Sequence, residues 1–326
     1  MKNKRGFEFG FAWIFAIFIG AIVIFLAVYA STSIIGIKRY EEEAATGAKI
    51  GSLLNPISTN LEQAKLTTIY VQDETIIFNE CESDSMFGEQ LLSTSVRTSI
   101  GQPWSKYPGP KSTFRDRYLF SNKTIHGKKE FYILSLPFEF PFKISDVVIM
   151  WSDTVKYCFI NPTSDFKREI ERLKLTNVEI KGNINDCSLE SKKVYFGGHA
   201  PSNYDIAINN EEVIYKLDSG DISVKYVHSS DNNNKFPLLY AAIFSDPETY
   251  ECQVKRLMGR AKALVTLYEE KFDYLKGSCL PGATSLALEN YKRRASNYDD
   301  SNDLLNIATL AQEIEDYNDP LKCRLF

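Results

Sequence analysis

The feature that most constrains this chain is a run of 29 uncharged residues from Phe9 to Ile37, rich in Phe, Ile, Val, Ala and Leu. A helix needs about 20 apolar residues to cross the hydrocarbon core of a bilayer. A buried helix of a soluble protein would carry polar residues at helical spacing, whereas the first polar residue here is Ser31. We therefore expect residues 9–37 to form a transmembrane helix whose partner is the lipid bilayer.

The charges that flank this run predict its orientation. Lys2, Lys4 and Arg5 precede it, whereas Lys38 and Arg39 follow it and are joined at once by three glutamates. Cytoplasmic flanks carry the excess of Lys and Arg, so residues 1–8 are expected to form a basic cytoplasmic tip. The body is then extracytoplasmic, and the chain is a single-pass protein of the cell membrane.

Two kinds of processing are compatible with an external body. Val28-Tyr29-Ala30-Ser31 has the small residues that a signal peptidase accepts, although the apolar run is longer than the usual signal core. The start, Lys4-Arg5-Gly6-Phe7-Glu8, resembles the leader of type IV pilins and related archaeal surface proteins. The whole opening is also similar to that of single-pass membrane proteins of small archaea.

The pilin resemblance extends only over the N-terminal segment. It implies cleavage after Gly6 and packing of the apolar helix into a filament. The family's acidic residue stands at the fifth position after the cut, whereas Glu8 would stand at the second.

Composition predicts a folded body and excludes one class of partner. The 326 residues are 44% hydrophobic and 25% charged, within the range of globular proteins, and include 18 Tyr and 21 Phe. The net charge is −4, and Lys and Arg are scattered among acids rather than gathered in a stripe. We therefore expect no nucleic-acid partner.

Between the anchor and Pro56 we expect a helical stalk over residues 38–56. Ala44, Ala45 and Ala48 favour helix, and Pro56 disfavours its continuation. The periodic segments that can build a core follow the stalk, so a chain lacking residues 1–52 is expected to fold.

Residues 57–245 are predicted to form a mixed-sheet α/β or α+β domain. Alternation over 67–71 and 75–78, around a turn at 72–74, predicts a hairpin. Apolar runs at 147–150 and 157–160 predict strands covered on both faces. A helix from Ser164 and a strand at 178–180 then complete a β-α-β unit. Further strands are predicted at 91–96, 117–120, 131–136, 194–196, 213–217, 222–227 and 238–244.

Residues 246–326 are predicted to form a three-helix module. Ser245, Pro247 and Glu248 are typical of a helix start, and apolar residues recur every three or four positions as far as Leu275. This first helix would be about 45 Å long. Shorter helices are expected at 284–296 and 301–317.

All six cysteines lie after the anchor, on the side where thiols oxidise, and their even number fits complete pairing. Six cysteines allow 15 connectivities. Their positions along the predicted elements favour three disulfides, Cys158 with Cys187, Cys279 with Cys323, and Cys81 with Cys252. Buried free thiols are the alternative.

The sequence contains no nucleophile elbow, P-loop, dinucleotide fingerprint or zinc spacing, so we assign no catalytic residue, cofactor or metal ligand. Its three histidines, His126, His199 and His228, stand apart. His199, in a loop after a predicted strand and near Asp205, could join Asp153 in a pocket. Asn122-Lys123-Thr124 matches a glycosylation acceptor.

Two classes of function remain open. The anchor and the absence of motifs favour a non-catalytic binding, interaction or envelope protein, whose partners would be other surface proteins; a pilin-like subunit is one form of it. The alternative is a membrane-tethered enzyme whose site is built from distant residues, such as those at the ends of the strands at 147–150 and 157–160.

Overall fold

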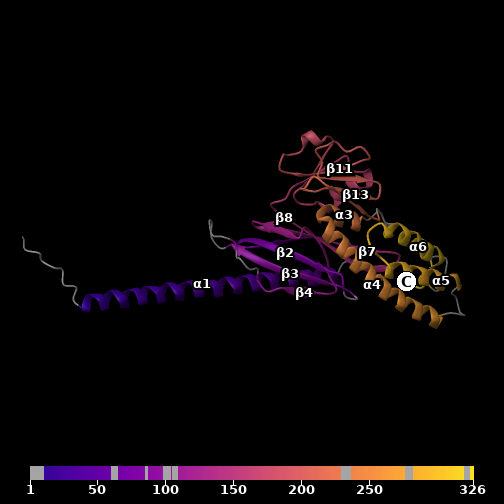
Figure 1. Cartoon of the computed structure of the whole chain (residues 1–326). Helices are drawn as coiled ribbons and strands as arrows, with labels where there is room; N and C mark the ends of the chain where they lie inside the picture. The colour runs from indigo at the N-terminus through magenta and orange to yellow at the C-terminus, as the bar shows by residue number, and fades with distance from the viewer. Residues whose placement is uncertain are drawn as a thin grey trace, which may run out of the picture.

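The computed structural model describes residues 11–59, 65–84, 87–97, 104, 109–228, 236–275, 282–318 and 324–326. A long N-terminal helix, α1 (Phe11–Thr59), extends from a body of sheets and helices (Figure 1). The mixed α/β class is confirmed, with an apolar helix first, mixed sheets next and helices at the C-terminal end.

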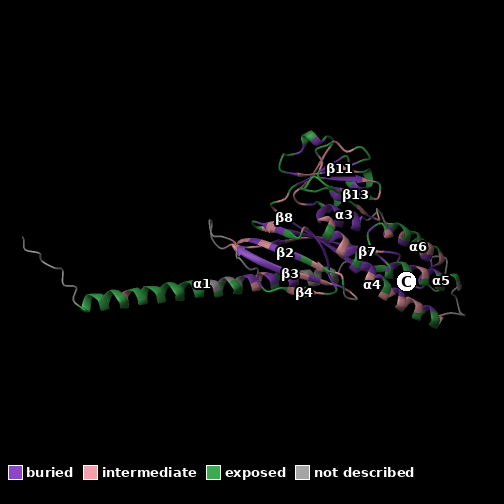
Figure 2. Ribbon diagram, in the orientation of Figure 1, coloured by how far each residue is buried: buried purple, intermediate pink, exposed green. Residues whose placement is uncertain are grey.

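The first half of α1 stands clear of the body and is exposed along its length (Figure 2). Residues Phe11–Ile34 have a mean hydropathy of 2.9, and none of them is buried. At 1.5 Å per residue this segment is about 36 Å long, enough for a hydrocarbon core of about 30 Å. Within the described residues it is the one helix long and apolar enough to cross a membrane.

The second half of α1 belongs to the core of the body. Glu43 and Ile50 are only 3% and 1% exposed. Thr94, on the neighbouring strand, donates its hydroxyl to the main-chain oxygen of Glu43 at 2.8 Å. A Cβ at Gly51 would lie 2.8 Å from the ring of Phe114, so glycine permits this close approach.

The expected stalk is therefore helical, but its second part is not free-standing. The helix continues past Pro56 to Thr59, and its turns at residues 43–51 pack on the sheet behind them. The docking face uses Gly47 and Gly51, which carry no hydrophobic signal in the sequence. The core of the body begins before residue 52, since Ile50 belongs to it, so the premise that every core segment follows the stalk is wrong. Folding of a chain that lacks residues 1–52 stays a prediction.

Two four-stranded sheets pack against each other beside α1. The first has the order β1-β7-β8-β5 and the second β4-β3-β2-β6. The strands of the first are β1 (Lys65–Tyr70), β7 (Glu130–Glu139), β8 (Lys143–Ser152) and β5 (Tyr118–Phe120). Those of the second are β4 (Ser112–Phe114), β3 (Glu89–Arg97), β2 (Glu74–Glu82) and β6 (Thr124–Gly127). Their shared core contains Ile50, Ile69, Ile77, Leu92, Leu119, Ile125, Phe131, Ile133, Val148 and Met150.

The predicted hairpin around residues 72–74 is wrong. β1 pairs with β7 in the first sheet, whereas β2 pairs with β3 and β6 in the second. The turn carries the chain from one layer to the other, so Ile69 and Ile77 join the same core from opposite sheets. Alternation identifies a strand but does not choose its partner.

A six-stranded sheet follows, with the order β10-β9-β11-β12-β13-β14. The predicted β-α-β unit is confirmed, since β9 and β10 are parallel and α2 (Ser164–Leu173) connects them. The predicted pair at 213–217 and 222–227 is also confirmed as antiparallel. The strands are β9 (Tyr157–Ile160), β10 (Val178–Lys181), β11 (Lys192–Phe196), β12 (Ile206–Asn209), β13 (Glu212–Lys216) and β14 (Ile222–Tyr226), and a 3-10 helix spans Ile184–Asp186.

The segment predicted as a strand at 238–244 is instead a helix, α3 (Pro237–Phe244), with every residue buried. A short apolar run does not distinguish a buried strand from a buried helix, and Pro237 at the first helical position was the overlooked signal. Phe244 at its end lies between two sheets, with its ring centroid 4.6 Å from that of Trp151 on β8 and 4.5 Å from that of Tyr157 on β9. α3 thereby joins the sheets into one core.

The C-terminal helices are those predicted. α4 (Pro247–Leu275), α5 (Gly282–Ser296) and α6 (Asp303–Asn318) pack in sequence, and α4 also lies along the first two sheets (Figure 1). Thr249 at the start of α4 donates its main-chain N–H to Asp246 at 2.8 Å, which caps the helix.

Two disulfides connect distant segments. Cys81 on β2 bonds to Cys252 on α4, and Cys158 on β9 bonds to Cys187, with Cα separations of 6.2 and 5.9 Å. Both pairings match those expected from the sequence, and bonded cysteines indicate an oxidising compartment. The third expected pair, Cys279 with Cys323, lies outside the described residues.

Beside the Cys81–Cys252 bridge, Arg256 of α4 is the centre of a buried polar network. Its side chain is 2% exposed, and burial lowers the pKa of its guanidinium to about 10. It donates to the main-chain oxygens of Phe87, Arg115 and Arg117 at 3.1, 3.1 and 2.8 Å. Its Nη1 also donates to Gln253, at 2.8 Å. One side chain thus satisfies carbonyls from two turns, the one between β2 and β3 and the one between β4 and β5.

Candidate binding site at the junction of the helix and the sheets

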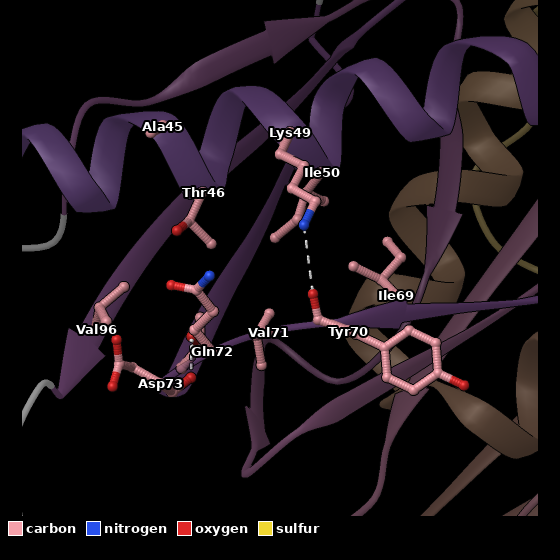
Figure 3. Close-up of a pocket in the computed structure, with 11 residues that line it drawn as sticks. Ala45, Thr46, Lys49, Ile50, Ile69, Tyr70, Val71, Gln72, Asp73 and Val96 are labelled. Carbon is pink, nitrogen blue, oxygen red and sulfur yellow. Dashed lines mark hydrogen bonds between the residues drawn. The ribbon is translucent and has the colours of Figure 1, made fainter.

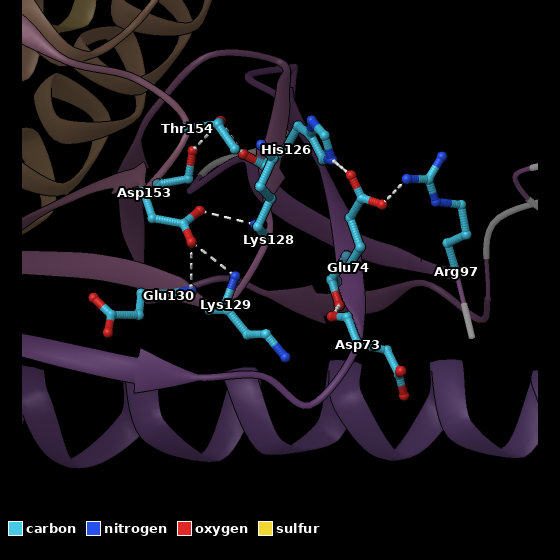
Figure 4. Close-up of polar contacts among 11 residues, drawn as sticks. Asp73, Glu74, Arg97, His126, Lys128, Lys129, Glu130, Asp153 and Thr154 are labelled. Atoms are coloured by element: carbon cyan, nitrogen blue, oxygen red, sulfur yellow. Dashed lines mark hydrogen bonds and ion pairs between the residues drawn. The ribbon is translucent and has the colours of Figure 1, made fainter. Parts of the chain in front are cut away.

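Asp153, one of the three candidate site residues, makes hydrogen bonds that hold the protein's own main chain in place. It follows β8, and its carboxylate accepts the main-chain N–H groups of Lys128 and Lys129 at 2.8 Å and of Glu130 at 3.3 Å (Figure 4). These bonds hold the turn between β6 and β7 against the end of β8. A carboxylate with three N–H donors is already well satisfied, which favours positioning the turn over proton transfer.

The other two candidates lie in the six-stranded sheet. His199 is exposed in the loop after β11. Asp205 accepts the main-chain N–H of Lys193 at 2.7 Å, which ties the start of β12 to β11. Within the described residues, no hydrogen bond or ion pair links Asp153 to His199 or Asp205. No group of three His, Cys, Asp or Glu side chains there could hold a metal ion.

A pocket of about 270 Å³ opens where α1 meets the sheets (Figure 3). We call it the junction pocket. It is bounded by the docked half of α1, the end of β1, the turn into β2, and β3. Its lining consists of Ala45, Thr46, Lys49, Ile50, Ile69, Tyr70, Val71, Gln72, Asp73, Thr75 and Val96.

The junction pocket has an apolar floor and a polar rim. Ile50 and Ile69 are each 1% exposed. Lys49 supplies a cation on one side, where its Nζ lies 3.5 Å from the main-chain oxygen of Tyr70, and Asp73 supplies a carboxylate on the other (Figure 3). The side chain of Tyr70 is 66% exposed and points away from the pocket, to which its main-chain oxygen contributes (Figure 3). This arrangement suits a ligand with an apolar body and polar ends, and it contains no activated nucleophile.

A polar cluster lies directly beside the junction pocket, on the outer side of β2, β3 and β6. Glu74 accepts from two directions, since its Oε1 lies 2.6 Å from Nε2 of His126 and its Oε2 pairs with Arg97 (Figure 4). The Arg97 guanidinium lies 5.1 Å from the centroid of the Trp104 ring, which also meets the edge of His126 at 5.5 Å. The charges are compensated within the cluster, so it stabilises this end of the sheet.

Two more hollows lie farther along the body. One of about 450 Å³ borders the Cys81–Cys252 bridge, with Lys123 and Glu248 ion-paired at its side. The other, of about 140 Å³, includes Asn122 and the rings of Trp151 and Phe244. Asn122 is half-buried between β5 and β6, and its glycosylation stays a prediction.

Sequence reasoning missed the junction pocket for an identifiable reason. Its walls come from α1, β1 and β3, and none of the contributing segments carries a recognisable motif. The one available signal was the charged and polar pair Gln72-Asp73 in a turn directly after an alternating strand.

Comparison of the chain with known proteins identified no relative. No family model matches the chain, and neither the curated proteins nor the solved structures contain a match.

Proposed function

We propose that this chain is a single-pass membrane-anchored interaction protein of the cell envelope, with its body on the extracytoplasmic side. One observation carries the proposal: α1 is a single unbroken helix that is apolar and exposed at one end and buried in the core of the body at the other. A helix built in this way serves both as anchor and as structural element. The body is therefore presented in a fixed orientation to the bilayer.

The disulfides and the charges at the ends of the anchor support the external location. Disulfides persist in oxidising compartments. Lys2, Lys4 and Arg5 before the apolar segment favour a cytoplasmic N-terminus. The junction pocket is then on the membrane-facing side of the body, where it is placed to receive a segment of a neighbouring envelope protein.

A photo-crosslinking experiment tests this function. Benzoylphenylalanine at Gln72, an exposed residue on the rim of the junction pocket, is expected to form a discrete adduct with another membrane or envelope protein in intact cells (Figure 3). Tyr274, an 88% exposed tyrosine near the end of α4, provides the control position. Asp73→Ala, which removes the carboxylate of the rim, should reduce the Gln72 adduct at least fivefold. The same adducts at both positions, or no effect of Asp73→Ala, would contradict the proposal.

A second candidate function, a pilin-like subunit, is favoured by the shape of α1. Its exposed apolar half projects from a body that packs on its other half, an arrangement that would let the free halves of several copies bundle together (Figure 2). The leader-like Lys4-Arg5-Gly6 accords with this candidate.

Processing at the N-terminus separates the two candidates. A pilin-like subunit should begin at Phe7 in the mature protein, and Gly6→Leu should abolish that cleavage. Mass spectrometry of the N-terminal peptide from native membranes gives the answer. A mature protein that begins at Met1 or Lys2 would contradict filament assembly and leave the anchored interaction protein in place.

A further inference from the structure

The six-stranded sheet ends in an open edge. β14 is its last strand, and within the described residues it pairs with β13 alone. The side chains of Ile222 and Val224 are 62% and 48% exposed. An edge strand with exposed apolar residues offers its main-chain donors and acceptors to a further strand.

The pairing with β13 determines which main-chain groups of β14 point outwards. Asp221 accepts a hydrogen bond at 2.9 Å from the residue after β13, and Val227 donates one at 2.7 Å to the residue before it. Bonded residues alternate in an antiparallel pair. The odd-numbered residues of β14 therefore face β13, and Ile222, Val224 and Tyr226 direct their N–H and C=O groups to the open edge.

The helical module already uses one of these three positions. The N–H of Tyr226 donates to the Ser301 hydroxyl at 3.0 Å, and its carbonyl accepts from the Tyr250 hydroxyl at 2.8 Å. The open ladder is thus limited to two residues, Ile222 and Val224, with two donors and two acceptors.

We propose that this edge pairs with the same edge of a second copy of the chain. In an antiparallel arrangement about a two-fold axis at Ser223, Ile222 of each copy lies opposite Val224 of the other. Each of these two pairs exchanges both main-chain hydrogen bonds, so four bonds use all of the free groups. The arrangement is isologous and closes on itself.

The side chains on both faces of β14 are self-complementary in this register. The exposed Asp221 of one copy lies opposite Lys225 of the other, twice. Lys225 already contacts Glu251 at 2.7 Å, so the added carboxylate extends an existing charge pair. On the other face Ile222 meets Val224, and cross-strand apolar pairs and opposite charges both stabilise antiparallel sheets.

This complementarity is what favours a second copy over an unrelated peptide. A shift of the register by two residues would place the incoming strand against Tyr226, whose groups are occupied. In the proposed register the residue opposite Tyr226 is Gly220, which has no side chain to obstruct the helical module. The contact is small, so it is a weak association suited to copies held in one membrane.

Disulfide trapping of the full chain in its native membrane tests the proposal. Residues on a two-fold axis between bonded pairs have Cα atoms about 4.5 Å apart, within the range that a disulfide spans. Ser223→Cys should give a covalent dimer on mild oxidation, at least tenfold above the wild-type chain. Ser219→Cys, in the preceding turn, is the control off the axis, and it is more exposed than the half-buried Ser223, so greater accessibility alone would favour the control. Association through α1 alone would label both positions equally.

Two variants made in the Ser223→Cys chain identify the contact. Val224→Pro removes an outward N–H and spares the bonds to β13, and Asp221→Lys opposes a lysine to Lys225 without touching the ladder. Each should lower dimer yield at least fivefold while the melting temperature of the body stays within a few degrees. A Ser223→Cys dimer no more abundant than that of Ser219→Cys would overturn the proposal. So would a dimer that survives both changes.

Discussion

Replacing Arg256 with methionine is expected to lower the free energy of unfolding of the body by about 3 kcal/mol. The substitution removes the donor of three main-chain oxygens: that of Arg117, in a buried contact, and those of Phe87 and Arg115, in partly buried ones. Each unsatisfied buried group costs about 1–3 kcal/mol, and relief of the desolvation of the guanidinium offsets part of the sum. The melting temperature should fall by about 6–12 °C.

Two further variants make this result specific to the network. Lys255→Met also replaces a basic side chain of α4 with methionine, but at an exposed position. It should alter the free energy of unfolding by no more than about 0.5 kcal/mol. Arg256→Lys keeps the charge but not the planar set of donors, so it should fall between wild type and Arg256→Met. If Arg256→Met had the same melting temperature as the wild-type chain, the carbonyls would have found other donors and the network would not contribute to stability.

A chain that begins at Leu53 is expected to be less stable than one that begins at Glu41 by about 4 kcal/mol or more. The shorter chain lacks Ile50, whose loss alone should cost about 2–5 kcal/mol in a packed core. It also leaves the Thr94 hydroxyl without its acceptor on Glu43. Urea unfolding of the two soluble chains, both prepared with their disulfides formed, measures the difference.

The full-length Ile50→Ala variant separates packing from the mere presence of the helix. It should lose about 2–5 kcal/mol, less than the truncation does. Equal unfolding midpoints for the chains that begin at Glu41 and Leu53 would show that residues 41–52 only lead to the body and do not support it.

Features encoded within one segment could be predicted from the sequence. The apolar start of α1, the long α4 and the β-α-β unit each carry their own periodicity or caps, and all three are present. The pairing of Cys158 with Cys187 followed from that unit, because parallel strands close in sequence bring their flanking residues together.

Features that depend on the choice of partner could not be predicted. β1 and β2 alternate alike, yet each pairs in a different sheet, because burial of Ile69 and Ile77 in one core outweighs the short turn between them. α3 is buried on all sides, so it shows no helical stripe. The junction pocket forms between α1, β1 and β3, so it depends on the docking of α1 and on the partner of β1, neither of which the sequence predicted.

Because α1 is continuous, the number of residues between the membrane and the body also determines the direction in which the body faces. Each residue of a helix advances it by 1.5 Å and turns it by about 100°. Residues 35–42 connect the apolar segment to the docked turns. Their number therefore determines both the height of the body above the membrane and its rotation about the axis of α1. One residue inserted there would rotate every external surface by about 100° around the helix axis. Seven inserted residues would raise the body by about 10 Å and leave it rotated by only about 20° from its original orientation.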